Sequence, residues 1–371
     1  MFRRFLVLAV LLVLAVIFFS ACTKKDTDVI KIGIAGPMTG DQSRYGADFS
    51  NGTELALKHW MEKGGVAGHK IDIVKEDDQH DPKQAVSIAN KLVNEGVAGV
   101  IGHFNSNCSI PASKVYMEGS VVEITPSTTN PKYSEQGYWN VFRVCGRDDQ
   151  QGNVAADFVR NKLKAARVAI VHDKTVYGQG ITDVFKSNLG DKAHVVYYGS
   201  IIQGDKDFKS VLTTIKGSNP DVVYFGGMYP EGGLLLKQAR EVGLNAIFVS
   251  GDGAMDAKLI EIAGKDAEGA YMTFTPDPSS IESAKAFIDE YTKKYGEPGP
   301  YSIYAYTAAN IMFQAINDTG TTDSRKVAEY IRTHSFDSPL GKVEFSPNGD
   351  NKNAHYVIWQ VKGGKFVQVT D

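Results

Sequence analysis

Residues 70–103, KIDIVKEDDQHDPKQAVSIANKLVNEGVAGVIGH, contain one complete strand–helix–strand unit. Strands are expected over 70–78 and 99–103, and the amphipathic segment 81–96 between them is expected to form a helix. Elsewhere in the chain the expected strands are nearly continuous runs of Val and Ile, as is typical of parallel strands covered on both faces. This alternation predicts an α/β doubly wound sheet.

The alternation occurs twice along the chain. It runs from Ile30 to about residue 145 and starts again with a helix expected over 148–165 and a strand over 167–173. Beyond about residue 277 the chain becomes mainly helical, and it closes with two apolar segments on either side of Gly363-Gly364, a β-hairpin signal. The short connections between the two halves suit a hinge better than tethered domains.

The first 22 residues, MFRRFLVLAVLLVLAVIFFSAC, have the features of an export signal. Two arginines precede an apolar run from Phe5 to Phe19, and small residues follow it. This pattern predicts a secretory signal peptide over 1–21. The alternative is an uncleaved membrane anchor, although the run of about 15 apolar residues is short for a bilayer. The FSAC motif resembles a lipoprotein signal-peptidase site, so Cys22 is the expected lipidation site and 22–29 a polar tether.

Composition and charge exclude several classes of function. The chain has 371 residues, of which 43% are hydrophobic and 22% charged, which is ordinary for a globular protein of about two domains. The formal net charge is −3 without a block of Lys and Arg, which argues against binding to nucleic acid. No metal-ligand cluster and no dinucleotide fingerprint is apparent, so neither metal nor cofactor is expected. Cys108 and Cys145 could form a disulfide or remain two thiols.

An enzyme is the first alternative class. His103 and Cys108 could be imagined as a base and a nucleophile, with Asp81 or Asp252 orienting the histidine. However, His103 ends an apolar strand, where histidines are mostly structural, and no local spacing fixes an acidic partner. We therefore expect no catalytic residue.

Several long segments resemble a known family. These are IKIGIAGPMTGDQSRYG, the stretch 77–103, ITPSTT, AIVHDKTVYGQG and VYFGGMYPEGGLLLKQAREVG. They are similar to the extracytoplasmic proteins that bind branched-chain amino acids (leucine, isoleucine and valine) and deliver them to an ABC transporter. The resemblance covers most of residues 30–360. It implies a type I periplasmic-binding fold, with two doubly wound parallel-sheet lobes joined by a three-strand hinge. Lobe 1 would comprise 30–145 and about 277–353, and lobe 2 would comprise 146–276 and about 354–371.

An amino-acid ligand needs donors for its carboxylate. The loop 104–109 leads into a helix expected to start near Ile110, and free amides at a helix N-terminus favour an anion. By resemblance, Ser106 and Thr129 would bind the carboxylate, and Ser127 would contact the ligand mainly through its backbone. Helix capping or turn chemistry is the structural alternative for these residues.

The ligand's ammonium group needs an acidic partner. Asp252 ends an apolar strand, where an unpaired charge is costly. The resemblance implies an acidic residue here that binds the amino group, commonly a glutamate, and Asp is one methylene shorter. The structural alternative is an N-cap for the helix that follows.

The side chain of the ligand needs an apolar wall. Tyr45 and Tyr177 follow the first strand of each lobe, and by resemblance Tyr177 closes over the ligand. Met228 stands where the family often has an aromatic residue, which favours an adaptable pocket. Tyr301 or Tyr304 is a further candidate, with core packing as the alternative.

The expected partners are a small amino acid, an ABC permease and a membrane reached through lipid on Cys22, and the protein is expected to be a periplasmic or extracytoplasmic monomer. A repressor would need a DNA-binding head before the first lobe, where a signal and a tether stand instead. A ligand-sensing receptor domain for a different amino acid, amide or small carboxylate is the remaining alternative.

Overall fold

The computed structural model describes residues 29–370. The predicted signal peptide and the Cys22 lipidation site lie outside these residues. The strands are β1 (Ile30–Gly36), β2 (Ile71–Asp77), β3 (Gly99–Gly102), β4 (Val122–Thr125), β5 (Val141–Arg143), β6 (Arg167–His172), β7 (His194–Ser200), β8 (Val222–Gly226), β9 (Ile247–Ser250), β10 (Tyr271–Phe274), β11 (Ser335–Ser338), β12 (Gly341–Glu344), β13 (Val357–Lys362) and β14 (Lys365–Gln368). The α-helices are α2 (Ser43–Glu62), α3 (Pro82–Asn94), α4 (Ser106–Glu118), α5 (Lys132–Glu135), α6 (Asp148–Asp157), α7 (Val176–Asn188), α8 (Lys209–Gly217), α9 (Tyr229–Glu241), α10 (Ala257–Ala263), α11 (Glu282–Tyr295), α12 (Ser302–Thr319) and α13 (Ser324–Thr333).

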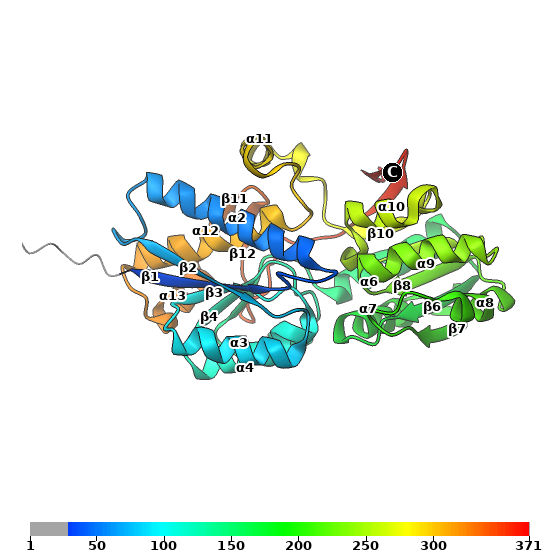
Figure 1. Cartoon of the computed structure of the whole chain (residues 1–371), viewed down its shortest axis with the longest axis horizontal. Coiled ribbons are helices and arrows are strands. Elements are labelled where there is room, and N and C mark those ends of the chain that lie inside the picture. The colour runs from blue at the N-terminus through cyan, green and yellow to red at the C-terminus, as the bar shows by residue number, and fades with distance from the viewer. Residues whose placement is uncertain (1–28, 371) are drawn as a thin grey trace, which may run out of the picture.

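The first sheet is parallel and has the strand order β2-β1-β3-β4-β5. Helices α2 and α12 cover one face, and α3 and α4 cover the other (Figure 1). Because both faces are covered, side chains such as Ile34, Val100 and Ile124 are fully buried. The strand order reverses between β1 and β3, and ligands of open α/β sheets bind beyond the carboxyl ends of the strands at such a point.

The second sheet repeats this plan. Its order is β14-β13-β10-β9-β8-β6-β7, and the strands from β7 to β10 are parallel with a reversal between β6 and β8. Strands β13 and β14 add an antiparallel edge, in which Lys362 pairs with Lys365 across Gly363-Gly364. The doubly wound α/β class and the terminal hairpin predicted from the sequence are both confirmed.

Three chain connections run between the two sheets (Figure 1). They are residues 144–147 between β5 and α6, residues 275–281 between β10 and α11, and residues 345–356 between β12 and β13. We call the parts built on the first and second sheets lobe 1 and lobe 2. The boundaries proposed from the sequence, near 145, 277 and 353, remain a prediction.

Two local expectations are corrected by the structure. The helix after β3 begins at Ser106 and not near Ile110. Proline favours the first turn of a helix, so Pro111 indicates a later start in the sequence, yet this helix accommodates it in its interior. The single helix predicted over 148–165 is α6 followed by a π-helical segment, Phe158–Lys162. Such a change in backbone hydrogen bonding has no clear sequence signal.

Candidate functional site

The segments that leave the carboxyl ends of four strands meet where the lobes face each other. Tyr45 follows β1 and Ser106 follows β3 in lobe 1, whereas Tyr177 follows β6 and Asp252 follows β9 in lobe 2. All four side chains are buried. The Tyr45 hydroxyl donates to the Gly253 carbonyl at 3.0 Å, so the two lobes are in direct contact here. Both reversal points of the strand order therefore contribute to one interlobe site.

Asp252 lies at the centre of this site. Its carboxylate accepts hydrogen bonds from the Tyr301 hydroxyl (2.6 Å), the Tyr177 hydroxyl (2.8 Å) and Gln151 Nε2 (2.9 Å). Tyr301 comes from lobe 1, and the other two donors come from lobe 2. A carboxylate offers about four acceptor positions, so one remains for a further donor.

A second carboxyl group, Asp148, lies beside Asp252. Gln151 Nε2 also donates to Asp148 Oδ1 at 3.2 Å and therefore links the two acids. Burial raises the pKa of Asp252, and burial together with the charge of Asp252 raises the pKa of Asp148 well above its usual value. Burial and mutual repulsion make it unfavourable for both acids to be ionised at once. A cationic group bound beside them would relieve this repulsion, so the pair is a suitable partner for a cation.

A group of hydroxyls lies next to this acidic pair, at the N-terminus of α4 and in the segment after β4. The Ser127 hydroxyl donates to the Phe104 carbonyl at 2.9 Å, and Ser106 Oγ accepts from the Asn130 amide at 3.4 Å. Within residues 29–370, Thr129 Oγ1 and Asp148 Oδ2 are buried without a hydrogen bond of ordinary geometry. The two groups are nevertheless close enough for Thr129 to lower the pKa of Asp148.

Buried Arg143 holds the loop that carries these hydroxyls. Its guanidinium donates to the carbonyls of Thr128 (2.8 Å) and Asn130 (3.1 Å). The first amides of α4 have no capping side chain, and Asn105 Nδ2 donates to Gln42 Oε1 at 2.9 Å. Amides and hydroxyls at a helix N-terminus are suited to hold an anion.

Aromatic rings pack beside these polar groups, since Tyr45 and Tyr301 bond to the segment of Asp252 and Phe104 precedes α4. The rings of Tyr45 and Phe104 are stacked with centroids 3.9 Å apart, and Tyr301 meets both of them edge-on. Met228 is the residue directly before the first residue of α9, and its side chain is buried. Its sulfur lies 2.9 Å from where a β-carbon on Gly253 would be, so the segment containing Asp252 packs against it.

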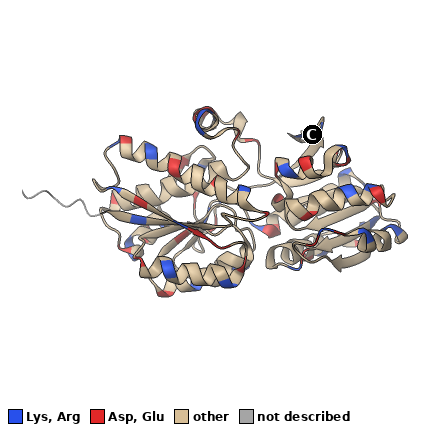
Figure 2. Ribbon diagram, viewed as in Figure 1, with Lys and Arg blue, Asp and Glu red and all other residues tan. Residues whose placement is uncertain are grey.

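Charged side chains join the lobes at the rim of this site. Arg44 Nε lies 3.2 Å from Asp256 Oδ1, and Lys206 Nζ lies 2.6 Å from Asp41 Oδ2. The Tyr229 hydroxyl donates to the Asp41 carbonyl across the same gap. We call these five residues the interlobe latch. Elsewhere, Lys and Arg alternate with Asp and Glu over the helices of both lobes (Figure 2).

The chemically reactive side chains near this site have structural roles. Both ring nitrogens of the buried His103 are occupied, by Asp78 at 2.8 Å and by the Tyr116 hydroxyl at 3.0 Å. Cys108 and Cys145 are buried as free thiols, and burial raises the pKa of both. Among the described residues, this arrangement brings no nucleophile and base together.

Comparison with known proteins agrees with this architecture. The family model described as periplasmic binding protein matches residues 29–365. The chain belongs to this family. It is 42% identical over 352 residues to the Leu/Ile/Val-binding protein homolog 1 of Brucella abortus, covering 94% of each chain. It is 38% identical over 339 residues, 90% of each chain, to the leucine-, isoleucine-, valine-, threonine- and alanine-binding protein of Pseudomonas aeruginosa.

Solved structures of related binding proteins have the same fold. A leucine-binding protein from Thermotoga maritima matches with a TM-score of 0.86 and 31% identity, covering 92% of this chain and 98% of the other. A branched-chain amino acid transporter substrate-binding protein from Streptococcus pneumoniae, solved with isoleucine, matches with a TM-score of 0.84 and 26% identity over 92% and 100%. The type I periplasmic-binding fold predicted from the sequence is thereby confirmed.

Family membership decides the general class of function. The periplasmic binding proteins are extracytoplasmic solute-binding proteins, and this member is a binding protein and not an enzyme. Within residues 29–370 there is no cluster of three or more His, Cys, Asp or Glu side chains able to hold a metal ion. No helix in that part of the chain is long and apolar enough to cross a membrane.

The structure brings most of the predicted site residues together. One region contains Tyr45, Tyr177, Asp252, Tyr301 and Met228. Ser106 begins α4, and Ser127 and Thr129 lie in the segment after β4 that contacts it. The geometry distinguishes Tyr301, the N-cap residue of α12, from Tyr304 within that helix. Tyr301 faces Asp252, whereas the hydroxyl of Tyr304 pairs with Thr275.

Sequence reasoning missed three residues of this region. Asp148 and Gln151 begin α6, and a sequence of this kind, DDQQGN, looks like an ordinary exposed helix start. Their complete burial at the junction of the lobes is a tertiary property. Phe104 directly follows His103 after the carboxyl end of β3, and an aromatic residue at a strand end was the available signal.

Proposed function

We propose that the protein captures a free branched-chain amino acid, leucine, isoleucine or valine, in the interlobe site and delivers it to the permease of an ABC transporter. The observation that carries the proposal is the meeting of a buried acidic pair with a hydroxyl-bearing helix N-terminus, beside a cluster of aromatic rings. Asp252 and Asp148 form the acidic pair, and the N-terminus of α4 offers free amides and hydroxyls. A zwitterion with an apolar side chain has the complementary charges.

Each proposed contact uses a different physical feature. The ligand carboxylate would bind Ser106, Thr129 and the first amides of α4, and Ser127 would contribute mainly its backbone. The ammonium would take the remaining acceptor position of Asp252. Tyr45, Tyr177, Tyr301 and Met228 would surround the aliphatic side chain, with the adaptable methionine allowing several shapes.

Closure of the lobes would accompany binding. In an open form, lobe 1 would hold the carboxylate and lobe 2 would then bring Tyr177 and Asp252 onto the ligand. Because those contacts exist only in the closed form, ligand shifts the population towards it. We further propose that the closed monomer is what the permease recognises, and that lipid on Cys22 holds the protein at the membrane.

Calorimetric titration of ligand-stripped protein tests the proposal. We expect binding of leucine, isoleucine and valine and weaker binding of phenylalanine. 4-Methylpentanoate and 3-methylbutylamine, which lack the ammonium and the carboxylate of leucine respectively, should bind far more weakly. The names of two Pseudomonas aeruginosa relatives, an amino acid binding protein and one that also names threonine and alanine, make alanine and threonine necessary additions to the panel. Absence of heat with every amino acid would refute the proposal.

A further inference from the structure

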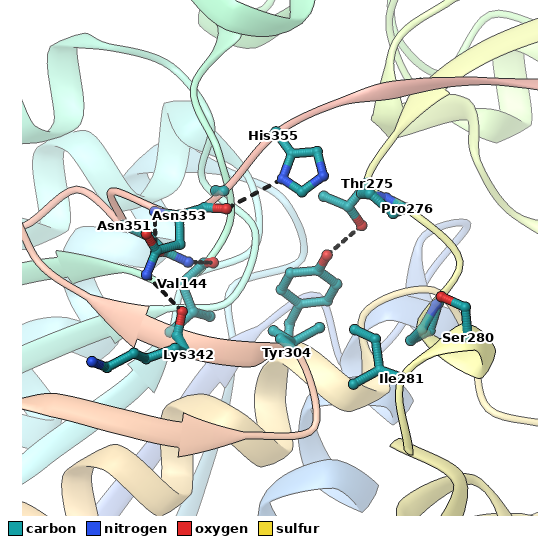
Figure 3. A pocket seen from close by; sticks show the side chains of 13 residues that line it. Val144, Thr275, Pro276, Ser280, Ile281, Tyr304, Lys342, Asn351, Asn353 and His355 are labelled. Carbon is teal, nitrogen blue, oxygen red and sulfur yellow. Dashed lines mark hydrogen bonds between the residues drawn. The ribbon is translucent and has the colours of Figure 1, made fainter. Parts of the chain in front are cut away.

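A cavity of about 280 Å³ lies among the three connections between the lobes, outside the site around Asp252 (Figure 3). Val144 from the first connection, Thr275 and Ile281 from the second, and Ala354 and His355 from the third all line it. We call it the hinge cavity. Its volume is near the lower end of the roughly 300–1,000 Å³ that is usual for small-molecule sites.

The walls of the hinge cavity are mostly apolar and the polar groups at its edge are held in place. Pro276, Ile281, Leu340 and the ring of Tyr304 supply apolar surface. The Tyr304 hydroxyl points away from the helix and pairs with Thr275 (Figure 3). A wall of this composition accommodates a hydrocarbon or aromatic body.

Among residues 29–370, the lining contains a basic side chain and no acid. Lys342 and His355 line the cavity, and no Asp or Glu is among its lining residues within the described chain. Lys342 Nζ does pair with Glu344 at 3.1 Å, but Lys352 Nζ approaches the same carboxylate at 3.6 Å. Asp337 also stands opposite Lys342 in the β11–β12 pairing, so the acids near this lysine lie outside the cavity lining while the lysine belongs to it. An anion is favoured there, whereas the ammonium of an amino acid would find no carboxylate.

One layer of rings separates the hinge cavity from the interlobe site. The ring centroid of Tyr304 lies 5.9 Å from that of Tyr301, and Phe274 contacts both rings. The Tyr301 hydroxyl in turn donates to Asp252. Packed side chains of this kind can transmit an effect on the lobe arrangement, because both sites depend on it.

We propose that the hinge cavity is a second ligand site, specific for a small monocarboxylate with an aliphatic or aromatic body and no amino group. Its carboxylate lies towards Lys342 and His355, and its apolar body lies against Ile281, Leu340 and Tyr304. Because the cavity is formed by all three connections in the structure with the lobes in contact, its occupant stabilises that arrangement. Ligand binding in the interlobe site and in the hinge cavity is then mutually favourable.

Fluorine NMR with 4-fluorobenzoate tests the second site on the full chain. The titration is done with leucine saturating, so that a benzoate in the interlobe site is displaced. We expect binding that leucine does not remove, weakened about tenfold or more by the double variant Lys342→Gln/His355→Gln. Both side chains are exposed, so the variant keeps the fold. Lys209→Gln, an exposed lysine on α8, is the matched control and should bind as the unmodified protein does. Absence of leucine-insensitive binding, or equal binding by the double variant, would overturn the proposal.

Calorimetry tests the coupling, which rests on the proposed function. With 4-fluorobenzoate at saturation, leucine should bind about fivefold or more tightly to the unmodified protein and unchanged to the double variant. An unchanged leucine Kd in the unmodified protein would overturn the coupling. If no amino acid of the panel binds, the proposed function fails separately. The hinge cavity is then tested by comparing Asp252→Asn with the double variant, since only the latter should lose 4-fluorobenzoate.

Discussion

Replacement of Asp252 by asparagine isolates the charge at the centre of the interlobe site. Asparagine has nearly the same volume, and its oxygen can accept from Gln151 and Tyr177 as Oδ1 does now. Its amide group can donate to the Tyr301 hydroxyl, which accepts after rotation. The hydrogen bonds around the side chain are therefore retained, and the change removes mainly the negative charge.

The expected loss of affinity follows from that charge. A hydrogen bond to a charged group contributes about 1.5–3 kcal/mol, so Asp252→Asn should weaken leucine binding about 10- to 150-fold. Isothermal titration at constant pH measures the change. Asp205→Asn, an exposed acid in lobe 2, is the matched control and should leave the Kd unchanged.

The pH dependence gives an independent readout. Burial raises the pKa of Asp252 in the ligand-free protein, so part of the carboxyl population stays protonated at pH values at which an ordinary aspartate is fully ionised. An ammonium ion binds the ionised form and lowers that pKa, so binding releases protons and affinity increases as the pH rises through the raised pKa. Titrations in two buffers of different ionisation enthalpy count the released protons. An Asp252→Asn protein that binds leucine within about twofold of the unmodified protein, or that shows the same pH slope, would refute this role of Asp252.

Three further predictions concern other buried groups. Burial raises the pKa of Asp48 from 3.8 to about 7, although hydrogen bonds from Tyr301 and Ser302 lower it. The folded state therefore binds the proton more tightly, and this contribution to stability, about 4 kcal/mol at most, is present below pH 4 and lost as the pH rises through 7. Urea unfolding should show the unmodified protein losing stability relative to Asp48→Asn over this range, and parallel pH curves would contradict it. Arg44→Gln leaves Asp256 of the interlobe latch without its partner, so leucine affinity should fall about threefold to tenfold. X-ray scattering of the ligand-free variant should show a larger radius of gyration than that of the unmodified protein. An unchanged radius and an unchanged Kd would disprove a role of Arg44 in closure. Cys108→Ala should bind leucine with a Kd within a few-fold of that of the unmodified protein. In the folded unmodified protein, iodoacetamide should leave the Cys108 thiol unreacted, because burial raises its pKa. Rapid alkylation of Cys108 would show that the thiol is accessible.

The regular parts of the fold were predictable because local patterns encode them. The Val- and Ile-rich segments became strands of two parallel sheets, and the amphipathic segments became the helices that cover them. The prediction was wrong where a local signal competes with packing. Pro111 is typical of a helix start, but it lies inside α4, whose first residue, Ser106, is buried and accepts from the backbone amide of Asn130.

The candidate site likewise contains residues that the sequence indicated and residues that it did not. Residues at the carboxyl ends of strands, such as Ser106 and Asp252, were available from the sequence, since strand ends of a doubly wound sheet converge. Asp148 and Gln151 were not, because their local sequence is polar and typical of an exposed helix start. Their burial results from the crossing of the chain between the lobes.

The sequence by itself determined the α/β class, the duplication into two lobes and the family, because hydrophobic periodicity and long matching segments are properties of the chain in order. Only the tertiary structure decided which of two tyrosines, Tyr301 or Tyr304, faces Asp252 and which lines the hinge cavity. The two residues lie three apart, at the N-cap and in the first turn of α12, and both are buried and aromatic. Their difference arises from the elements of lobe 2 that meet each ring, and no local pattern contains that information.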